Sequence, residues 1–345
     1  MGIYIFIAVF LGVLAFDRKT NLFLPFILLF IVSVFRAQTV GIDYVAYKTA
    51  YLYEISSNVP LSYLLYKFEI GWLFLNIFMQ SFSGSFEFLI AIVSFFTIFS
   101  FFYVLRKETK SPIFAILLYV LLFYYSLSFS LIKQGLATSF FLLSVYFFSE
   151  NKKVKSIFSA LLFAVLHYSS IALIPFAILA HYIKVSNKKM LISLLVTFCI
   201  GILGITDEAR SLIMLLPFEK YAHYADYKVD VDVNRLNVYL FLVPKNIMCC
   251  IIFYYLPEAK KIYKNLFFFG LIIANLFISI SLVSRFVLYF FSFEIILLTN
   301  LIFLYNGKKR TNLLFAVIIY ALVYFIYNLI TNRGGVIPYK LYFQW

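Results

Sequence analysis

The chain has 345 residues, of which 64% are hydrophobic and only 13% are charged, and its mean hydropathy is +0.97. A soluble protein is about half apolar and about a quarter charged, so this composition excludes a soluble globular protein. The apolar runs are continuous, whereas the strands of a membrane β-barrel alternate between apolar and polar residues. The sequence therefore predicts an all-α, polytopic membrane protein with a single membrane domain over residues 1–345.

The net charge of +14 does not indicate nucleic acid as a partner. Most Lys and Arg residues lie in short clusters between the apolar runs, a pattern typical of cytoplasmic loops that set membrane topology. Cys199, Cys249 and Cys250 all lie inside apolar runs, so we expect neither a disulfide framework nor a zinc site.

Ten apolar segments are candidate membrane spans, and two further segments are ambiguous. The candidate spans are residues 2–16, 22–35, 86–105, 112–129, 131–149, 190–205, 238–256, 266–282, 286–305 and 313–330. The ambiguous segments are residues 61–82 and 156–183. The basic clusters all fall on one side of the membrane only if each ambiguous segment enters the membrane and leaves it again on the same side. We therefore favour ten crossings with two re-entrant segments over twelve crossings, with outer loops at about 36–60 and 206–237.

Ionisable residues within or beside apolar spans are costly and are therefore candidates for function. They are Arg36, Glu69, Lys133, His167, Lys245, Arg285 and Glu294.

In the first outer loop, Asp43 and Tyr47 are four residues apart and share one face if this stretch is helical. An acid beside a phenol suits a hydrogen bond to a sugar or removal of a hydroxyl proton. A solvated loop whose aspartate caps a helix is the alternative interpretation.

Lys133, followed by Gln134 and Gly135, fits contact with an anion, and snorkelling of the lysine to the interface is the alternative. His167 can accept a proton near neutral pH. The alternative is a structural histidine whose ring is hydrogen-bonded to a hydroxyl on a neighbouring helix. Arginine binds phosphate with two parallel hydrogen bonds. We therefore expect a cationic rim suited to a diphosphate, formed by Arg36, Lys133, Arg210, Arg235 and Arg285, with interface anchoring as the alternative.

Several short motifs then point to a known family. They are F-R-x4-G-x-D-Y-x2-Y, E-x-G-W, K-Q-G-L-A, L-H-Y-S-S and S-R-F-V-L-Y-F, in this order from about Phe35 to Phe290. On these motifs the chain resembles the EpsG family, membrane proteins of bacterial exopolysaccharide and O-antigen synthesis grouped with the Wzy-type polymerases. It departs from the family at Lys133, where arginine is more usual, and lysine lacks the fork that contacts phosphate bidentately.

The resemblance implies a GT-C-like bundle of about 10 to 12 transmembrane segments. Such a protein polymerises undecaprenyl-diphosphate-linked oligosaccharide repeat units at the outer face of the bacterial inner membrane, without a metal or cofactor. The glycan leaves its lipid diphosphate and is transferred to a sugar hydroxyl of the next unit. A membrane-embedded chain-length regulator is an expected further partner.

Family positions carry over to ten residues, which are Arg36, Gly41, Asp43, Tyr44, Tyr47, Glu69, Gly71, Gln134, His167 and Arg285. From these family positions and from the side-chain chemistry described above, we expect three catalytic residues, which are His167, Asp43 and Glu69. We expect substrate binding by Arg36, Tyr44, Tyr47, Lys133, Gln134, Arg210, Arg235 and Arg285.

Three other functions stay open. A flippase for the same lipid would place charges around a midplane cavity between repeated halves, but no repeat is visible. A metal-dependent glycosyltransferase would pair acidic residues in the first outer loop, where Asp43 has no close acidic neighbour. An O-antigen ligase uses the same donor, and the sequence does not separate it from a polymerase.

Overall fold

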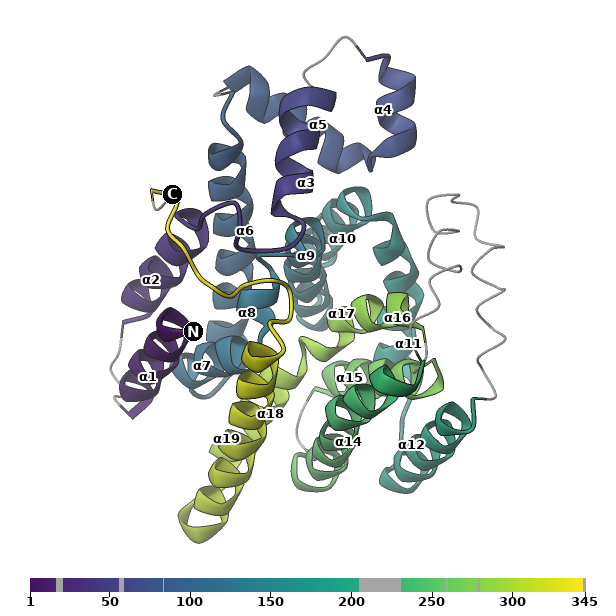
Figure 1. Cartoon of the computed structure of the whole chain (residues 1–345). Coiled ribbons are helices and arrows are strands. Elements are labelled where there is room, and N and C mark those ends of the chain that lie inside the picture. Colours follow the sequence, from purple (N-terminus) through teal and green to yellow (C-terminus); the bar gives the residue numbers. More distant parts are fainter. Residues whose placement is uncertain are drawn as a thin grey trace. The chain divides into compact units, whose positions relative to one another are not determined.

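A computed structural model describes residues 1–16, 21–55, 59–82, 84–204, 231–257, 260–277 and 280–343 (Figure 1). These residues form helices and no β-sheet, apart from one isolated bridge between Arg36 and Leu341. Three helical stretches are long and apolar enough to cross a membrane, namely Phe86–Glu108, Val283–Leu304 and Gly307–Ile330, and shorter apolar helices accompany them. The predicted class, an all-α polytopic membrane protein, is confirmed.

The structure consists of two compact units. The first unit comprises Met1–Ile174 and Ile302–Trp345, and the second comprises Pro175–Leu301. The helices of the first unit are α1 (Gly2–Phe16), α2 (Phe23–Val34), α3 (Tyr44–Thr49), the π-helix η1 (Ala50–Glu54), α4 (Leu61–Lys67), α5 (Ile70–Phe82), α6 (Phe86–Glu108), α7 (Pro112–Leu121), α8 (Tyr124–Leu127), α9 (Ile132–Ser149), α10 (Lys153–Leu166), the 3-10 helix η2 (Tyr168–Ala172) and α19 (Gly307–Ile330).

The second unit holds α12 (Asn187–Ile202), α14 (Val231–Tyr255), α15 (Lys261–Leu276), α16 (Ser281–Phe286) and α17 (Leu288–Phe291). Two further helices, α11 (Leu173–Tyr182) and α18 (Glu294–Leu304), run across the boundaries of the two units.

Both segments that the sequence left ambiguous are broken helices. In 61–82, α4 ends at Lys67 and α5 begins at Ile70, with Phe68 in an extended conformation. In 156–183, α10 ends at Leu166 and His167 is extended, with φ −153° and ψ 102°. The ambiguous hydropathy of each segment thus corresponds to a helix that stops and restarts.

The expected single span 112–129 is also interrupted, which corrects the prediction. The helix α7 ends at Leu121, and Phe123 has φ +68°, a left-handed backbone that a phenylalanine rarely adopts. The aromatic residues on either side still pack together, since the Tyr119 and Tyr125 rings lie 6.0 Å apart. Continuous hydrophobicity conceals such a break, because no glycine or proline marks it.

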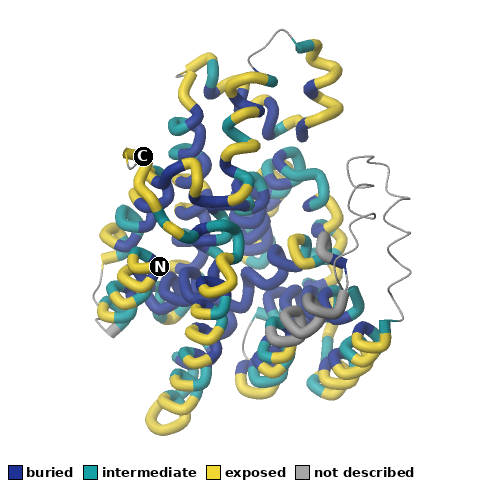
Figure 2. The backbone as a smooth tube through the Cα atoms, in the orientation of Figure 1, coloured by how far each residue is buried: buried dark blue, intermediate teal, exposed yellow. Residues whose placement is uncertain are grey.

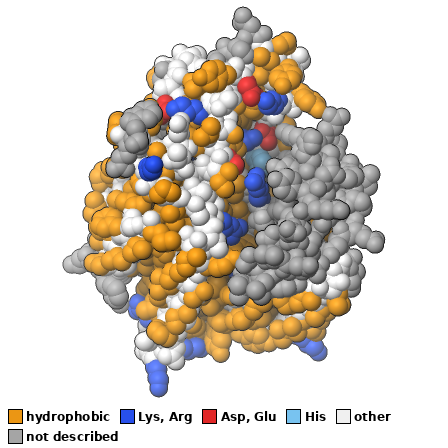
Figure 3. Space-filling view, viewed as in Figure 1, with side chains coloured by type: hydrophobic (Ala, Val, Ile, Leu, Met, Phe, Trp, Pro, Cys, Tyr) orange, Lys and Arg blue, Asp and Glu red, His pale blue; other side chains and the backbone are white. Residues whose placement is uncertain are grey.

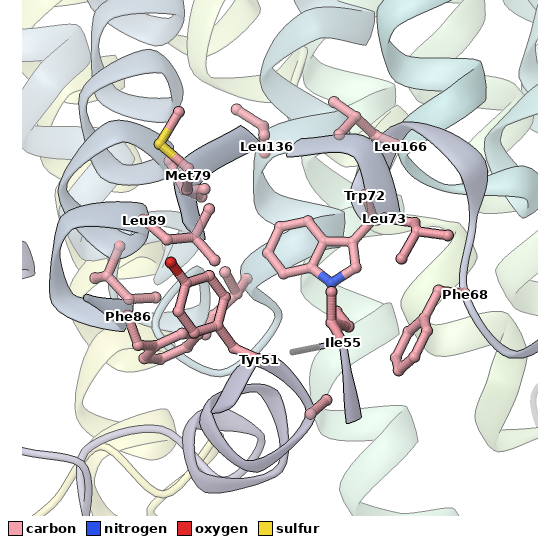
Figure 4. Close-up of a cluster of buried hydrophobic side chains, with 14 of the residues drawn as sticks. Tyr51, Ile55, Phe68, Trp72, Leu73, Met79, Phe86, Leu89, Leu136 and Leu166 are labelled. Carbon is pink, nitrogen blue, oxygen red and sulfur yellow. The ribbon is translucent and has the colours of Figure 1, made fainter. Parts of the chain in front are cut away.

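The first unit is built around α9, which packs against both α6 and α10, while α5 packs against α10. Most residues of α7 and α9 are buried, whereas the lower part of α19 is exposed (Figure 2). One apolar cluster joins the segment after α2 to this helical core. In Figure 4 the Trp72 indole lies at its centre, with Tyr51 and Phe86 on one side and Phe68 on the other.

The described part of the expected outer loop 36–60 contains α3 and η1. Residues 334–342, which we term the strap, run back over its first part (Figure 1). The Ala37 N–H donates to the Lys340 carbonyl at 2.8 Å, and the Tyr342 N–H donates to the Phe35 carbonyl at 2.8 Å. The second expected loop, 206–237, lies mainly outside the described residues, and its last part, from Val231, belongs to α14.

A buried ion pair lies in the second unit. The Lys245 ammonium on α14 donates to the Glu294 carboxylate at 2.5 Å, and both side chains are almost fully enclosed. The ammonium also lies over the rings of Phe241 and Phe291. Two charges can occupy such an apolar environment because each neutralises the other.

Candidate functional site

The candidate site forms where the breaks of the two ambiguous segments meet. Glu69 lies between α4 and α5, and the Leu73 N–H donates to its carbonyl at 2.9 Å in the first turn of α5. Close approach of α5 to α10 depends on Gly71. A Cβ on Gly71 would lie 2.6 Å from Val165 Cγ2 and 2.8 Å from the Val165 backbone, so a larger residue would force the two helices apart.

His167 reaches Glu69 because α10 stops one residue earlier. Its Nδ1 lies 3.4 Å from Glu69 Oε1, which is within ion-pair range but longer than a normal hydrogen bond. The Ser170 N–H and hydroxyl both donate to the His167 carbonyl, which fixes the extended backbone at this position. The neighbouring Tyr168 hydroxyl accepts a hydrogen bond from the Ile70 N–H at 3.0 Å, a second link between the two breaks.

Lys133 completes the cluster from the first turn of α9. Its Nζ donates to Glu69 Oε2 at 2.6 Å and lies 5.7 Å from the centroid of the Tyr47 ring. Tyr47 in turn packs edge-on against Trp72, with ring centroids 5.3 Å apart. Four separate parts of the chain therefore supply one polar cluster: α3, the residue before α5, the first turn of α9 and the residue after α10.

The Glu69 side chain is the enclosed member of this cluster, and its two partners reach the surface. Its exposed fraction is 4%, against 15% for Lys133 and 21% for His167. Figure 3 shows a histidine surface beside basic and acidic patches on the face that it presents. A buried carboxylate between two partly exposed basic groups can orient both of them towards a ligand.

This geometry has a definite chemical use. A carboxylate that accepts a hydrogen bond from the Nδ1–H of a histidine orients the ring and leaves Nε2 to accept a proton. Glu69 faces Nδ1 at 3.4 Å, so this contact would have to shorten to form that bond. The same carboxylate stabilises the imidazolium that forms. Lys133 has further N–H bonds with which it can contact an anionic group. The cluster can therefore combine proton removal with stabilisation of a negative charge.

Arg36 is enclosed within the protein, not exposed at an open rim as the sequence led us to expect. Only 2% of the residue is exposed. Its Nη1 donates to the Ser33 carbonyl, and its Cζ lies 4.8 Å from the ring centroid of Phe129 and 5.2 Å from that of Tyr44. The strap pairs with its backbone through Leu341.

Burial shifts the pKa values of Arg36 and of its neighbour Tyr44. Burial lowers the pKa of the Arg36 guanidinium, and the neighbouring tyrosines counteract this shift. Burial raises the pKa of the Tyr44 hydroxyl to about 12, although Arg36 opposes the rise. Tyr44 also packs edge-on against Phe86 at 5.2 Å. Arg36 and Tyr44, both predicted to bind substrate, therefore lie beneath the surface in this structure.

The remaining predicted residues lie in several places. Asp43 precedes α3, and the Tyr47 N–H donates to its carbonyl at 3.0 Å, which confirms that the two lie one helical turn apart. Gln134 is buried beside Lys133 in α9. Arg285 is exposed on α16 in the second unit. Arg210 lies outside the described residues, and for Arg235 only the helical backbone of α14 is described.

Two contributors to the site, Tyr168 and Trp72, are not among the residues predicted from the sequence. Tyr168 directly follows His167 in the motif L-H-Y-S-S, and Trp72 directly follows Gly71 in the motif E-x-G-W. This adjacency in the sequence was the one indication that they could belong to the site. The strap had no comparable signal, because backbone atoms make its contacts with residues 35–42. Among the described residues, no three His, Cys, Asp or Glu side chains are grouped as metal ligands.

Replacing Gly71 by alanine is expected to disrupt this site. The new Cβ would overlap Val165, so α5 must move away from α10, and Glu69 must move away from His167. Overpacking of this kind destabilises a protein by about 1–3 kcal/mol. Thermal unfolding of the purified protein in nanodiscs measures the effect. Gly2→Ala is the control, because a Cβ at this other helix start meets nothing within 4 Å; equal stability of both variants would contradict the close approach.

Comparison with known proteins identifies one family. The sequence model of the EpsG family matches residues 19–341 of the chain. No curated protein and no solved structure matches it.

Proposed function

Because the chain belongs to the EpsG family, we propose that it polymerises undecaprenyl-diphosphate-linked oligosaccharide repeat units at the outer face of the bacterial inner membrane. Membership in the family supports a role of the polysaccharide-polymerase type in general. The lipid carrier, the membrane face and the residue roles below are our proposal. The observation that carries it is the Glu69 carboxylate held between Lys133 and His167.

The proposed reaction transfers the growing glycan between two lipid carriers. The acceptor is a sugar hydroxyl of the incoming lipid-linked unit, and its oxygen forms a bond with the anomeric carbon of the growing glycan. The bond between that carbon and the diphosphate oxygen breaks, and the electron pair leaves with undecaprenyl diphosphate. The hydroxyl proton passes to a base on the protein, so the reaction needs a base and a stabiliser of the departing anion.

His167 is the base in this proposal. Glu69 faces its Nδ1 at 3.4 Å, which leaves Nε2 to accept the proton of the acceptor hydroxyl. As the imidazolium forms, the contact with the carboxylate strengthens, because opposite charges then face each other. Glu69 is accordingly a positioning residue, whereas Asp43, the other predicted base, precedes α3 and supports Tyr47 through the backbone.

Lys133 stabilises the leaving diphosphate in this proposal. Its Nζ is anchored by Glu69 at 2.6 Å, and the side chain reaches the surface. A charged amine held in place before the reaction stabilises developing negative charge without reorganisation. Tyr47, beneath the ammonium, presents an aromatic ring of the kind that contacts sugar faces. The predicted contacts of Arg210, Arg235 and Arg285 with the diphosphate remain part of the proposal.

Two experiments test the proposed function. In a strain deleted for the gene, single repeat units should accumulate on lipid or core, and the wild-type gene should restore long ladders. The purified protein should also lengthen a synthetic undecaprenyl-diphosphate repeat unit with no other protein present. Absence of all surface glycan in the deletion strain would favour a flippase, and unchanged ladders would refute the proposal. Inhibition of the purified enzyme by a chelator would favour the metal-dependent alternative.

A further inference from the structure

A groove in the first unit runs between α1 and α19, with α7 as its floor. The helix α7 packs against both α1 and α19. Two cavities lie along these helices, with volumes of about 950 Å³ and about 420 Å³. They share Gly12, Leu117 and Ile318 as lining residues, so they adjoin along these helices. We term the two together the α1–α19 groove; none of its lining residues belongs to the Glu69 cluster.

The two ends of the groove differ in chemistry. Basic side chains from three elements line the larger cavity: Arg106 near the end of α6, Lys110 in the following loop and Arg310 in the first turn of α19. The Arg310 guanidinium lies 4.5 Å from the ring centroid of Phe303, which holds it in place. The smaller cavity is lined by apolar side chains and Gly12 alone.

The apolar part of the groove is open to the surroundings. On α1, the exposed fractions of Ile5 and Val9 are 50% and 61%, and on α19 Leu322 and Ile326 are 40% and 51% exposed. Exposed side chains of this kind on a membrane protein face lipid. Gly12 adds free space, because a Cβ there would meet no atom within 4 Å.

We propose that the α1–α19 groove binds an anionic glycerophospholipid. The phosphate lies among Arg106, Lys110 and Arg310, and an acyl chain follows the apolar trough between α1 and α19. A cationic end that adjoins an apolar cavity matches the amphipathic shape and charge of this ligand. The predicted topology places these basic residues on the cytoplasmic side, where anionic lipids concentrate. This site is independent of the proposed polymerase activity and extends beyond it.

Matched variants test the headgroup contact. Arg106→Gln/Arg310→Gln removes two charges that line the groove. Lys107→Gln/Lys308→Gln removes two exposed charges from the same basic clusters, neither of which lines it. Full-length proteins are purified in detergent, supplied with dioleoylphosphatidylglycerol or dioleoylphosphatidylcholine, and analysed by native mass spectrometry. We expect the groove variant to retain about tenfold less phosphatidylglycerol than wild type, and the control variant to retain the wild-type amount.

A third variant tests the acyl-chain contact with every charge in place. Gly12→Leu projects a side chain into free space, so the protein should fold while the groove is filled. It should also lose phosphatidylglycerol, and thermal unfolding checks that all three variants are folded.

Several results would overturn the proposal. Equal loss in both charge variants would indicate a diffuse surface effect, and equal retention of phosphatidylcholine would remove the requirement for an anionic headgroup. Displacement of the lipid by inorganic phosphate would show that only a phosphate ion binds. Preference for undecaprenyl phosphate over phosphatidylglycerol would assign the groove to the carrier lipid instead. None of these results depends on polymerase activity.

Discussion

The variant Glu69→Gln is expected to lower the rate of polymerisation by a factor of about 10²–10⁴, the usual contribution of a positioned acid–base system. Glutamine has the shape of glutamate but no charge. Lys133 would lose the carboxylate that it contacts at 2.6 Å, and the His167 imidazolium would no longer be stabilised. The rate is measured as the lengthening of a synthetic lipid-linked repeat unit by the purified variant.

The matched control for this variant is Glu87→Gln. Glu87 also contacts a lysine, since the Lys48 ammonium lies 2.7 Å from its carboxylate, but both side chains are partly exposed. Exposed ion pairs contribute at most about 1 kcal/mol, so this variant should stay within a few-fold of the wild-type rate. If Glu69→Gln polymerised as fast as Glu87→Gln, the cluster around Glu69 would have no part in catalysis.

We expect Arg36→Ala to destabilise the protein by roughly 3 kcal/mol or more. The substitution removes the donor to the Ser33 carbonyl and the cation between the Phe129 and Tyr44 rings. It also leaves a cavity, because the arginine side chain is enclosed. Thermal unfolding in nanodiscs measures the loss, and limited proteolysis should then cut more readily within the strap.

Lys340→Ala provides the control for Arg36→Ala. Lys340 is an exposed cation on the strap, and its backbone carbonyl accepts a hydrogen bond from the Ala37 N–H. Its removal should change stability by no more than about 0.5 kcal/mol. A wild-type melting temperature for Arg36→Ala would show that the enclosed guanidinium is not structural. It would restore the interpretation of Arg36 as a direct contact of the diphosphate.

The sequence predicted the helical membrane class and most helix positions, because continuous hydrophobicity is a local property. It also marked the segments 61–82 and 156–183 as irregular. The charged residues within them, Glu69 and His167, were singled out for their cost in an apolar environment. Their pairing with Lys133 could not be predicted, since Glu69 and Lys133 are 64 positions apart and only tertiary packing brings them together.

The enclosure of Arg36, where an exposed rim was expected, has a different physical cause. An arginine that follows an apolar helix is expected to point towards water or lipid headgroups. Here the strap covers the backbone around it, and the rings of Phe129 and Tyr44 enclose the guanidinium. The strap does this largely through backbone hydrogen bonds, which leave no pattern in the sequence. The break at Phe123 escaped prediction for a similar reason, because its strained backbone is fixed by surrounding packing.

The strap also sets an order of biogenesis. Tyr339 donates to the carbonyl of Val32, 307 positions earlier in the chain, so one side of this contact is synthesised long before the other. Until the strap is synthesised, the backbone around Arg36 lacks its pairing with residues 340–342. The earlier helices can pack first, and the strap pairs with residues 35–42, just before α3, only afterwards. The fold of the first unit is therefore completed only when the strap has been synthesised and has paired with residues 35–42.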